Sequence, residues 1–528
     1  MSVNILERTF PGRSSLFLFL LGSAAVTVGV LLHLPMFWMG RNAGFRLAGM
    51  AMGSDMLGGM FLIVAGIGVA AYGLLPQGLV RQQLLARRIS VHAPDDARLT
   101  SAHWMLMGVL VIALVIDVMK PAALGFVMPG MVDEYGVAKR TASLVPFFAL
   151  VGTVTGSITW GIIADIYGRK ASIMLSAVVF VGTSICGAMP SLAWNMGMCF
   201  LMGAGAGGML PVTYALLAEI MPARHRGWAL VLVGGLGAAG GYFAASGLSA
   251  WLVPILSWRV LWLINLPTGL LLVALGGLLP ESAKFLLSRG LRSEALAVMA
   301  RFGTRSHTLK ELEDDEFDTL DHPLETPSSA RPGAALLWSA EFAGRTTALS
   351  VAALAWGLIN FGLLLWLPGA LVERGYSMGA SSRLLAESAL IAIPTVFICA
   401  WLYSKWSTRW SLVALMAVTL AGLGWVLILD RTAANPVLPV ALLIIGSNGL
   451  LAILLPYTAE CYPLQIRGRA TGWVAACTKG GGVIAQTLSI SALVPPLWVA
   501  CCMIMAPVAV SLYLTCRFGT ETRAIELK

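Results

Sequence analysis

Two ionisable residues three positions apart lie in the middle of an apolar stretch. Asp117 and Lys120 fall near the centre of the run Met105–Met131, which is long enough to cross a bilayer, since a spanning helix needs about 20 residues. A charge at mid-depth costs at least ~2.5 kcal/mol on insertion scales, so these groups need each other, another polar group or a water-filled cavity. The i, i+3 spacing puts both on one helix face, within pairing reach. Two interpretations stay open: a self-neutralising structural pair, or a site for substrate and protons.

The composition identifies a polytopic membrane protein, which makes the lipid bilayer its expected partner. Of 528 residues, 58% are hydrophobic and 12% are charged, against about 25% charged in soluble domains. The net charge of +9 does not indicate nucleic-acid binding, because the basic residues are scattered over short loops without a contiguous basic, aromatic-laced face. The eight cysteines show no metal-ligand spacing. Neither H-E-x-x-H nor G-x-S-x-G occurs. We therefore expect no metal, no cofactor and no enzymatic activity.

Apolar runs divide the chain into fourteen predicted spans, so the expected fold is an all-α membrane protein. The first run, Ser15–Met39, is longer than the ~7–15 residues of a signal-peptide core, so we interpret it as a retained span. A second follows at Leu47–Leu75, and then a basic linker. From His103 onward come twelve core spans, in two halves of six: 104–129, 143–165, 170–190, 194–220, 227–251, 258–279, 346–372, 382–404, 410–430, 436–460, 468–493 and 496–516.

These spans define five predicted regions. Residues 1–100 hold two extra helices and the linker, 101–279 the amino-terminal bundle, 280–345 an interdomain loop with surface helices, 346–516 the carboxyl-terminal bundle, and 517–528 a tail. Roughly three times as many Lys and Arg fall on the side of the amino terminus as on the other, which predicts both termini in the cytoplasm. The expected location is a bacterial inner membrane.

A repeated element supports the division into two halves. Glu219 and Arg226 belong to E-x-x-P-x-x-x-R-G at the end of the fourth core span, and Glu460 and Arg467 belong to the same pattern at the end of the tenth. Two parallel six-helix repeats with a matched element form a known transporter architecture, whose substrate site lies between the halves.

The loop between the second and third core spans reads G-I-I-A-D-I-Y-G-R-K over residues 161–170. It resembles the G-x-x-x-D-x-x-G-R-[RK] signature of the major facilitator superfamily. There, the signature forms a cytoplasmic latch that biases one access state. The resemblance therefore implies gating roles for Gly161, Asp165, Gly168, Arg169 and Lys170. The two glycines would allow close helix approach and a tight turn. The matching loop of the second half, 401–409, lacks the acid and the glycines, so any latch is asymmetric.

Three more stretches resemble the sugar-porter branch of that superfamily: Pro280-Glu281-Ser282 after the sixth core span, Glu521-Thr522 near the carboxyl end, and the repeated E-x-x-P-x-x-x-R-G. The resemblance covers residues 103–528. It adds Glu219, Arg226, Glu281, Glu460 and Arg467 to the predicted cytoplasmic gate. Cys199 stands where that branch has an arginine, and the glutamine-rich sugar site is missing. The run from Asp117 to Gly130 instead resembles the first helix of organic-acid and niacin-type carriers.

In this superfamily the first, fourth, seventh and tenth core spans line the cavity, and the second, fifth, eighth and eleventh meet across the halves. The resemblance thus places the following residues near a central cavity: Asp117, Lys120, Trp356, Asn360, Trp366, Glu387, Asn448, Tyr457, Lys479 and Gln486. For each aromatic residue alone, packing is the simpler interpretation. For Lys479, an interhelical partner and a substrate contact stay equally open.

The leading functional hypothesis is proton-coupled symport of a small organic anion by alternating access. Lys120 or Lys479 would hold the carboxylate, and Asp117 would accept the proton, with the proton gradient as energy source. We expect a small-molecule substrate and a monomer. A sugar or polyol carrier, a drug exporter, and a membrane sensor or interaction protein with vestigial transport are the alternatives.

Overall fold

The computed structural model describes residues 13–75, 98–288, 291–303, 336–429, 436–462, 464–491, 493 and 496–522, although not the side chains of Arg13, Asp165, Ser288, Leu429, Leu464, Gln465 and Arg467. The described residues form helices and connecting turns, with no strand among them. Long apolar segments take this form because a helix satisfies its own backbone hydrogen bonds where water is absent. Most of the predicted basic linker (76–97), a long part of the predicted interdomain loop (304–335) and the last residues of the tail (523–528) lie outside the described ranges.

Within these ranges, twelve helices are long and apolar enough to cross a membrane. Two of the fourteen predicted spans are not among the twelve. The sixth core span is represented by the shorter apolar stretch Val260–Gly276. The eleventh is α23 (Leu464–Ile490), which carries Arg469 and Lys479. The all-α prediction is confirmed, whereas the number of fully apolar spans is smaller than predicted.

The amino-terminal half contains α5 to α13. Its elements are α5 (Ser101–Tyr135), α6 (Lys139–Ala142), α7 (Leu144–Tyr167), α8 (Arg169–Gly182), η3 (Thr183–Ala188), α9 (Leu192–Ala206), α10 (Met209–Ile220), α11 (Ala223–Leu256), α12 (Val260–Leu263) and α13 (Asn265–Gly276). The predicted fourth span is two helices, because the chain breaks at Gly207 and Gly208. A Cβ at Gly208 would lie 2.1 Å from the Trp160 side chain, so only glycine permits this contact.

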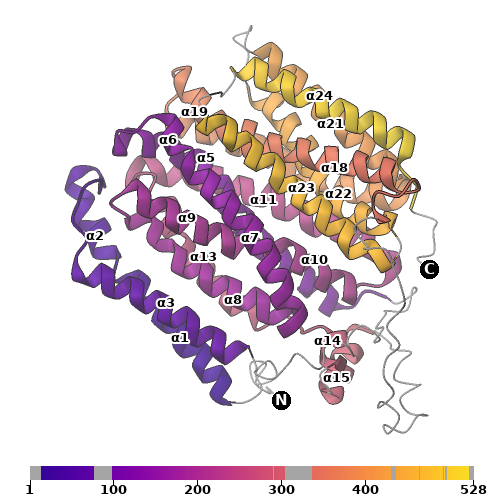
Figure 1. Ribbon diagram of the computed structural model, residues 1–528, viewed down its shortest axis with the longest axis horizontal. Helices are drawn as coiled ribbons and strands as arrows, with labels where there is room; N and C mark the ends of the chain where they lie inside the picture. Colours follow the sequence, from indigo (N-terminus) through magenta and orange to yellow (C-terminus); the bar gives the residue numbers. More distant parts are fainter. Residues whose placement is uncertain are drawn as a thin grey trace.

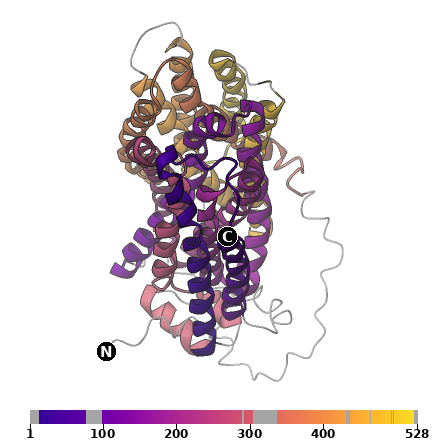
Figure 2. The same cartoon turned by 90° about the vertical axis from the view of Figure 1, so that its left-hand side faces the viewer.

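The carboxyl-terminal half repeats the arrangement. It contains α18 (Ala343–Leu358), the π-helical turn η5 (Ile359–Leu363), α19 (Leu364–Glu373), α20 (Met378–Trp401), the π-helical turn η6 (Leu402–Trp406), α21 (Thr408–Leu429), α22 (Val437–Cys461), α23 and α24 (Leu497–Phe518). Between the halves lie the short helices α14 (Ala283–Ser288) and α15 (Arg292–Phe302), in the predicted interdomain loop. Figure 2 shows them below the bundle.

The halves meet mainly along four helix pairs: α11 with α20, α11 with α22, α5 with α19, and α7 with α23. Gly125 of α5 is part of this contact, because a Cβ there would lie 2.9 Å from the Leu365 carbonyl oxygen of α19. Figure 1 shows the amino-terminal half in purple and magenta and the carboxyl-terminal half in orange and yellow.

An apolar hairpin precedes the amino-terminal half. It consists of α1 (Arg13–Leu31), α2 (Leu34–Met39), η1 (Gly40–Ala43) and α3 (Ser54–Leu74), so its second span begins seven residues later than predicted. Helices α1 and α3 pack backbone to backbone at glycines; a Cβ at Gly22 would lie 2.4 Å from Ala70 N. Both helices contact α8, at the edge of the bundle in Figure 1.

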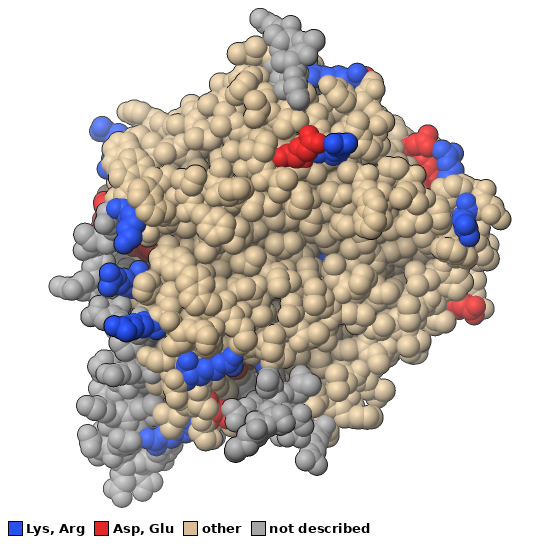
Figure 3. Space-filling view, turned by 180° about the vertical axis from the view of Figure 1, so that it is seen from behind, with Lys and Arg blue, Asp and Glu red and all other residues tan. Residues whose placement is uncertain are grey.

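The surface agrees with a membrane environment. In Figure 3 a broad face carries few charges, and Lys and Arg gather mostly along its left and lower-left border. The starts of α8 and α21 and the ends of α10 and α22 lie at one end of the bundle, which we call the motif end. The other end is the opposite end.

Candidate functional site

Asp117 lies on α5 with only 7% of its surface exposed. The self-neutralising i, i+3 ion pair with Lys120, which was one of the two open interpretations, is not formed. The Lys120 ammonium instead lies over the Phe180 ring of α8, 2.9 Å from its centroid. Neither Asp117 Oδ1 nor Lys120 Nζ has a hydrogen-bond partner in the described part of the chain. The shared helix face is real, but the long lysine side chain turns into the amino-terminal half.

Asp117 also lies within electrostatic range of Lys479 of α23, although no direct ion pair joins these two described residues. Lys479 comes from the other half, so opposite charges face each other across the interface. Its ammonium lies 5.5 Å from the centroid of the Phe361 ring. Unlike Lys120, which is 1% exposed, Lys479 is only partly buried. Of the two lysines, Lys479 is therefore the one that a ligand between the halves can reach.

Close glycine packing fixes the position of Lys479. A Cβ at Gly481 would lie 2.2 Å from the Leu354 carbonyl oxygen, and one at Gly357 would lie 2.1 Å from the Thr478 carbonyl oxygen. Helices α18 and α23 therefore touch backbone to backbone beside the lysine. Helix α18 ends at Leu358, and the π-helical turn η5 begins at the next residue. Such turns are frequent at functional sites.

The isolation of the Lys120 ammonium has a physical cost. Burial of an ion costs several kcal/mol even after relaxation, whereas a cation–π contact returns about 0.5–2 kcal/mol. Phe180 alone does not offset the burial. The ammonium therefore needs a further polar partner.

Several predicted cavity residues gather around the π-helical turn. Trp356 and Phe361 form an edge-to-face pair with centroids 5.6 Å apart. The Asn360 amide donates to the Trp356 carbonyl oxygen at 3.2 Å, and the Gln486 amide donates to the Phe361 carbonyl oxygen. The indole N–H of Trp356 has no hydrogen-bond partner in the described residues. This group can therefore serve a ligand.

The other predicted cavity residues lie in different surroundings. Trp366 on α19 also has a buried indole N–H without a partner among the described residues, and Asn448 of α22 is buried. Glu387 is exposed and accepts from Arg383 Nε at 2.9 Å. The Tyr457 hydroxyl donates to the Thr520 carbonyl oxygen at 2.7 Å, at the motif end. The structure thus does not bring Glu387 and Tyr457 to the Asp117–Lys479 interface.

Sequence reasoning missed two tyrosines of the amino-terminal half. Tyr214 of α10 and Tyr242 of α11 are buried, and their hydroxyls have no partner in the described ranges. The Tyr242 ring lies 6.1 Å from the Phe126 ring of α5. Buried tyrosine hydroxyls usually have a hydrogen-bond partner. A tyrosine inside an apolar span was therefore the sequence signal that could have marked these two residues.

At the motif end of the amino-terminal half, Glu281 caps helix α8. Its Oε1 accepts from the backbone N–H of Arg169 at 2.9 Å and of Lys170 at 3.4 Å. Burial raises the pKa of Glu281, against the opposing effect of these hydrogen bonds and of the Arg169 charge. Arg169 Nη2 in turn pairs with Glu219 Oε1 at 3.0 Å, and the Ser282 hydroxyl donates to Glu219.

The two motif glycines differ. Gly168 has φ +100°, and a Cβ there would lie 2.5 Å from Glu281 Oε2. A Cβ at Gly161 would meet nothing within 4 Å, so the close helix approach expected there is not observed. The side chain of Asp165 is outside the described part of the chain, so its predicted gating role stays a prediction.

The carboxyl-terminal half holds an equivalent cluster; the sequence predicted Glu460 as a gate residue and singled out Glu521-Thr522, but not their contacts with the start of α21. Glu521 accepts from the Thr408 backbone N–H at 3.0 Å, at the start of α21. The Thr522 hydroxyl donates to Glu460 Oε2 at 2.7 Å, as Ser282 does to Glu219. An acid after the sixth span thus caps the third helix in both halves, although the second loop lacks the motif's own acid. The Tyr403 hydroxyl also donates to Glu460, at 2.7 Å.

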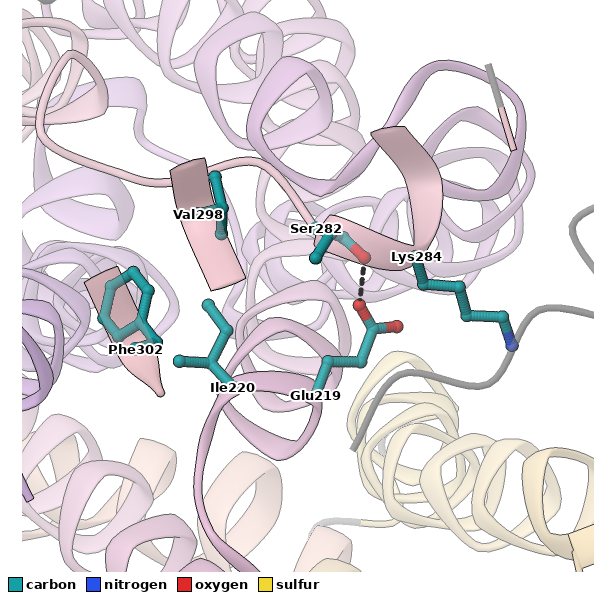
Figure 4. A pocket seen from close by; sticks show the side chains of 7 residues that line it. Glu219, Ile220, Ser282, Lys284, Val298 and Phe302 are labelled. Carbon is teal, nitrogen blue, oxygen red and sulfur yellow. Dashed lines mark hydrogen bonds between the residues drawn. The ribbon is translucent and has the colours of Figure 1, made fainter. Parts of the chain in front are cut away.

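The two repeated motifs meet at the interface of the halves. A Cβ at Gly227 would lie 2.9 Å from the Tyr403 ring and 3.3 Å from Glu460 Oε1. Arg226 is partly buried on the first turn of α11, and the Arg467 side chain lies outside the description. A small pocket beside Glu219 is lined by Ser282, Lys284, Val298 and Phe302 (Figure 4). It lies between α10 and the surface helices, away from the Asp117–Lys479 interface.

At the opposite end, the two halves are joined by polar contacts. Lys139 of α6 pairs with Glu373 of α19, and the hydroxyls of Ser143 and Ser489 lie 2.5 Å apart. These contacts join the two halves at the opposite end in this conformation. Sequence reasoning did not single them out, because each residue alone looks like an ordinary loop or helix-end residue.

The opposite end also holds a buried ion pair, Glu134 with Arg259, whose side chains are 3% and 0% exposed. Arg259 Nη2 donates to Glu134 Oε1 at 2.7 Å, and Arg259 Nη1 to the Met189 carbonyl oxygen at 2.8 Å. The hairpin joins this pair, because Leu47 N donates to Glu134 Oε1 at 2.6 Å and Ala48 N at 3.1 Å. The hairpin is thus tied to the ends of α5 and α12.

The geometry defines a class of protein: a membrane-embedded helical bundle of two related halves, with opposite charges meeting at their interface. Residues 105–486 match the family model described as the Major Facilitator Superfamily. The chain belongs to this superfamily and is a multi-pass membrane transporter.

Similar proteins include two from Acinetobacter baylyi (strain ATCC 33305 / BD413 / ADP1). The chain is 25% identical to "Niacin transporter NiaP" over 386 residues, covering 72% of this chain and 85% of that protein. It is 26% identical to "4-hydroxybenzoate transporter PcaK" over 419 residues, covering 77% and 89%. Among solved structures, the proton:xylose symporter XylE bound to 6-bromo-6-deoxy-D-glucose aligns with a TM-score of 0.64 at 18% identity, covering 81% of this chain and 98% of that one. This likeness shows the fold.

Proposed function

We propose that this transporter carries a small aromatic monocarboxylate together with a proton, by alternating access. The observation that supports it most is that Asp117 and Lys479, one from each half, interact electrostatically across the interface. A substrate carboxylate that binds Lys479 would compete with Asp117 for its partner. Asp117 would then take up a proton more readily, because a nearby cation favours the charged carboxylate. The two loads would be coupled.

The relatives support the substrate class. Niacin and 4-hydroxybenzoate, which two relatives are named for carrying, are both aromatic monocarboxylic acids. In this chain, Lys479 lies beside the Phe361 ring, and the Trp356 ring packs edge to face on Phe361. One cation and adjacent aromatic rings suit a flat ring that bears one carboxylate. An aromatic monocarboxylate as substrate is more similar to the substrates of niacin-type carriers than to those of sugar porters.

We infer that the motif end faces the cytoplasm, because it holds basic residues such as Arg169, Lys170, Arg224, Lys405 and Arg409. Both termini would then be cytoplasmic, in a bacterial inner membrane. One chain supplies both charges of the site, so a monomer suffices. Helices α1 and α3 precede the matched region 105–486, and we interpret them as an addition to a twelve-helix core.

The test is uptake by purified protein in liposomes with an imposed proton gradient, offering labelled nicotinate, 4-hydroxybenzoate and xylose. We expect accumulation of an aromatic acid and none of xylose. Accumulation of xylose alone would favour the sugar-carrier alternative. Absence of any uptake, together with thermal stabilisation by a ligand, would favour a sensor.

Three variants separate the roles of the charges. Lys479→Gln should raise KM about 30-fold, because loss of a charge-assisted contact to the substrate carboxylate costs about 2 kcal/mol. Lys120→Gln should leave KM nearly unchanged, since its ammonium turns away from the interface. Asp117→Asn should abolish accumulation but retain counterflow. Unchanged accumulation in Asp117→Asn, or an equal KM effect of the two lysine variants, would contradict the assignment.

A further inference from the structure

Buried polar atoms without partners cluster inside the amino-terminal half, away from the interface of the halves. In the part of the chain that the structure describes, these are Lys120 Nζ, Ser184 Oγ, Asn195 Oδ1, Trp262 Nε1 and both amide atoms of Asn265. All five residues are 0–1% exposed. Buried polar atoms are normally hydrogen-bonded to protein or to ordered water, so this concentration requires an explanation.

Known contacts connect these atoms around η3. The Lys120 ammonium lies over the Phe180 ring, one helical turn before Ser184, and η3 packs on α9. Ser184 lies two residues before Cys186 in the same short helix. Asn195 lies one turn before Cys199, on the same face of α9. The five side chains therefore surround one region rather than five separate ones.

Helix register adds Asn265. Gly269 of α13 lies against Val181 of α8, and Gly276 lies against Met174. Seven residues along α13 thus correspond to seven residues along α8, and the two helices run in opposite directions. Continued by one turn, this antiparallel register brings Asn265 level with Ile185, next to Ser184. Trp262 lies on α12, which packs on η3.

We propose that these residues line an internal water-binding pocket in the amino-terminal half, which hydrates the Lys120 ammonium and is separate from the substrate site between the halves. A buried water needs two to four polar partners, and this region supplies hydroxyl, amide, indole and ammonium groups. Toward the opposite end, Asn195 Nδ2 donates to the Tyr135 hydroxyl at 2.7 Å, and Arg259 Nη2 donates to it at 3.1 Å. The pocket therefore ends below the Glu134–Arg259 pair.

Hydration gives Lys120 a positioning role. With water at its ammonium, the side chain can stay charged at mid-depth without drawing Asp117 away from Lys479. This consequence rests on the proposed function, whereas the presence of water in the pocket does not.

The experiment is X-ray hydroxyl-radical footprinting of the full-length protein in nanodiscs, without substrate or gradient, read by mass spectrometry. Radiolysis of bound water produces radicals in place, so a buried cysteine beside water is oxidised and one in dry packing is not. Cys186 and Cys199 report on the pocket, and the equally buried Cys501 of α24 is the matched control. We expect several-fold faster oxidation of Cys186 and Cys199 than of Cys501. Equal rates would overturn the proposal.

A variant tests the lining directly. Asn265→Leu replaces the amide by an apolar group of similar size and should reduce Cys186 oxidation several-fold, while Cys501 stays unchanged. An unchanged Cys186 rate would refute the placement of Asn265. Since neither measurement involves transport, a dry pocket and a failed uptake assay would be distinct results.

Discussion

Removal of the Arg259 guanidinium should be among the most destabilising single changes at the opposite end of the bundle. In Arg259→Met, the carboxylate of Glu134 stays buried and loses three contacts of 2.7–3.2 Å from Nε and Nη2. The carbonyl oxygens of Gly187 and Met189 lose the donor Nη1. Only neutral N–H groups, from Trp258, Leu47 and Ala48, then remain as described donors to Glu134.

The expected magnitude follows from burial. Both side chains are almost fully inaccessible, and removal of one partner of a buried ion pair costs about 3–5 kcal/mol. The matched control is Arg46→Ala in the hairpin loop, which removes the pair with Asp133. Those side chains are 60% and 72% exposed, and an exposed pair contributes about 0–1 kcal/mol.

The assay is thermal unfolding in detergent, followed by a dye that reacts with cysteines as they become accessible. Cys186 and Cys199 are buried near the site and report its loss. For a cooperative unit the size of one half, we expect a decrease of about 6–20 °C in Arg259→Met and only a small one in Arg46→Ala. The double variant Glu134→Gln/Arg259→Met should recover part of the loss, because no buried charge is left unpaired. Similar decreases in both single variants would refute the reasoning.

Three further predictions concern the two ends of the bundle. Gly168→Ala should reduce both stability and transport, because its φ of +100° and a Cβ 2.5 Å from Glu281 Oε2 leave no room; Gly161→Ala, with open space around it, should be neutral in the same melting and uptake assays, and equal effects would contradict this account. Burial raises the pKa of Glu281, so folding favours its protonated form. The stability of the wild type should therefore rise relative to that of Glu281→Gln as the pH falls from above the raised pKa toward the ordinary value near 4.5. If the melting temperatures of the two proteins changed in parallel over this range, the effect would be excluded. Replacement of Glu373 by Lys should repel Lys139 and favour opening of the opposite end, seen as faster labelling of a cysteine introduced at Ser489, whereas Glu387→Lys, on the same half but paired with Arg383, should not change that rate.

Local sequence features were sufficient for much of the fold. Apolar runs predicted where helices form, because a segment in lipid must satisfy its own backbone hydrogen bonds. The failures have physical causes. The break at Gly207–Gly208 lies against the Trp160 side chain of another helix. The π-helical turn that contains Phe361 follows the contact of α18 with α23. Neither neighbour can be read from the segment itself.

The candidate site shows the same division. Residue types and spacing alone predicted that Asp117 and Lys120 are ionisable groups near the middle of a membrane span, and the loop 161–170 indicated the superfamily. Only the tertiary structure decided that Asp117 faces Lys479 from the other half, while Lys120 lies over Phe180. Helical spacing limits which groups can meet, but a lysine side chain can reach in several directions. The packing of the two halves selects among them, because glycine contacts such as Gly357 with Thr478 set how closely the helices approach.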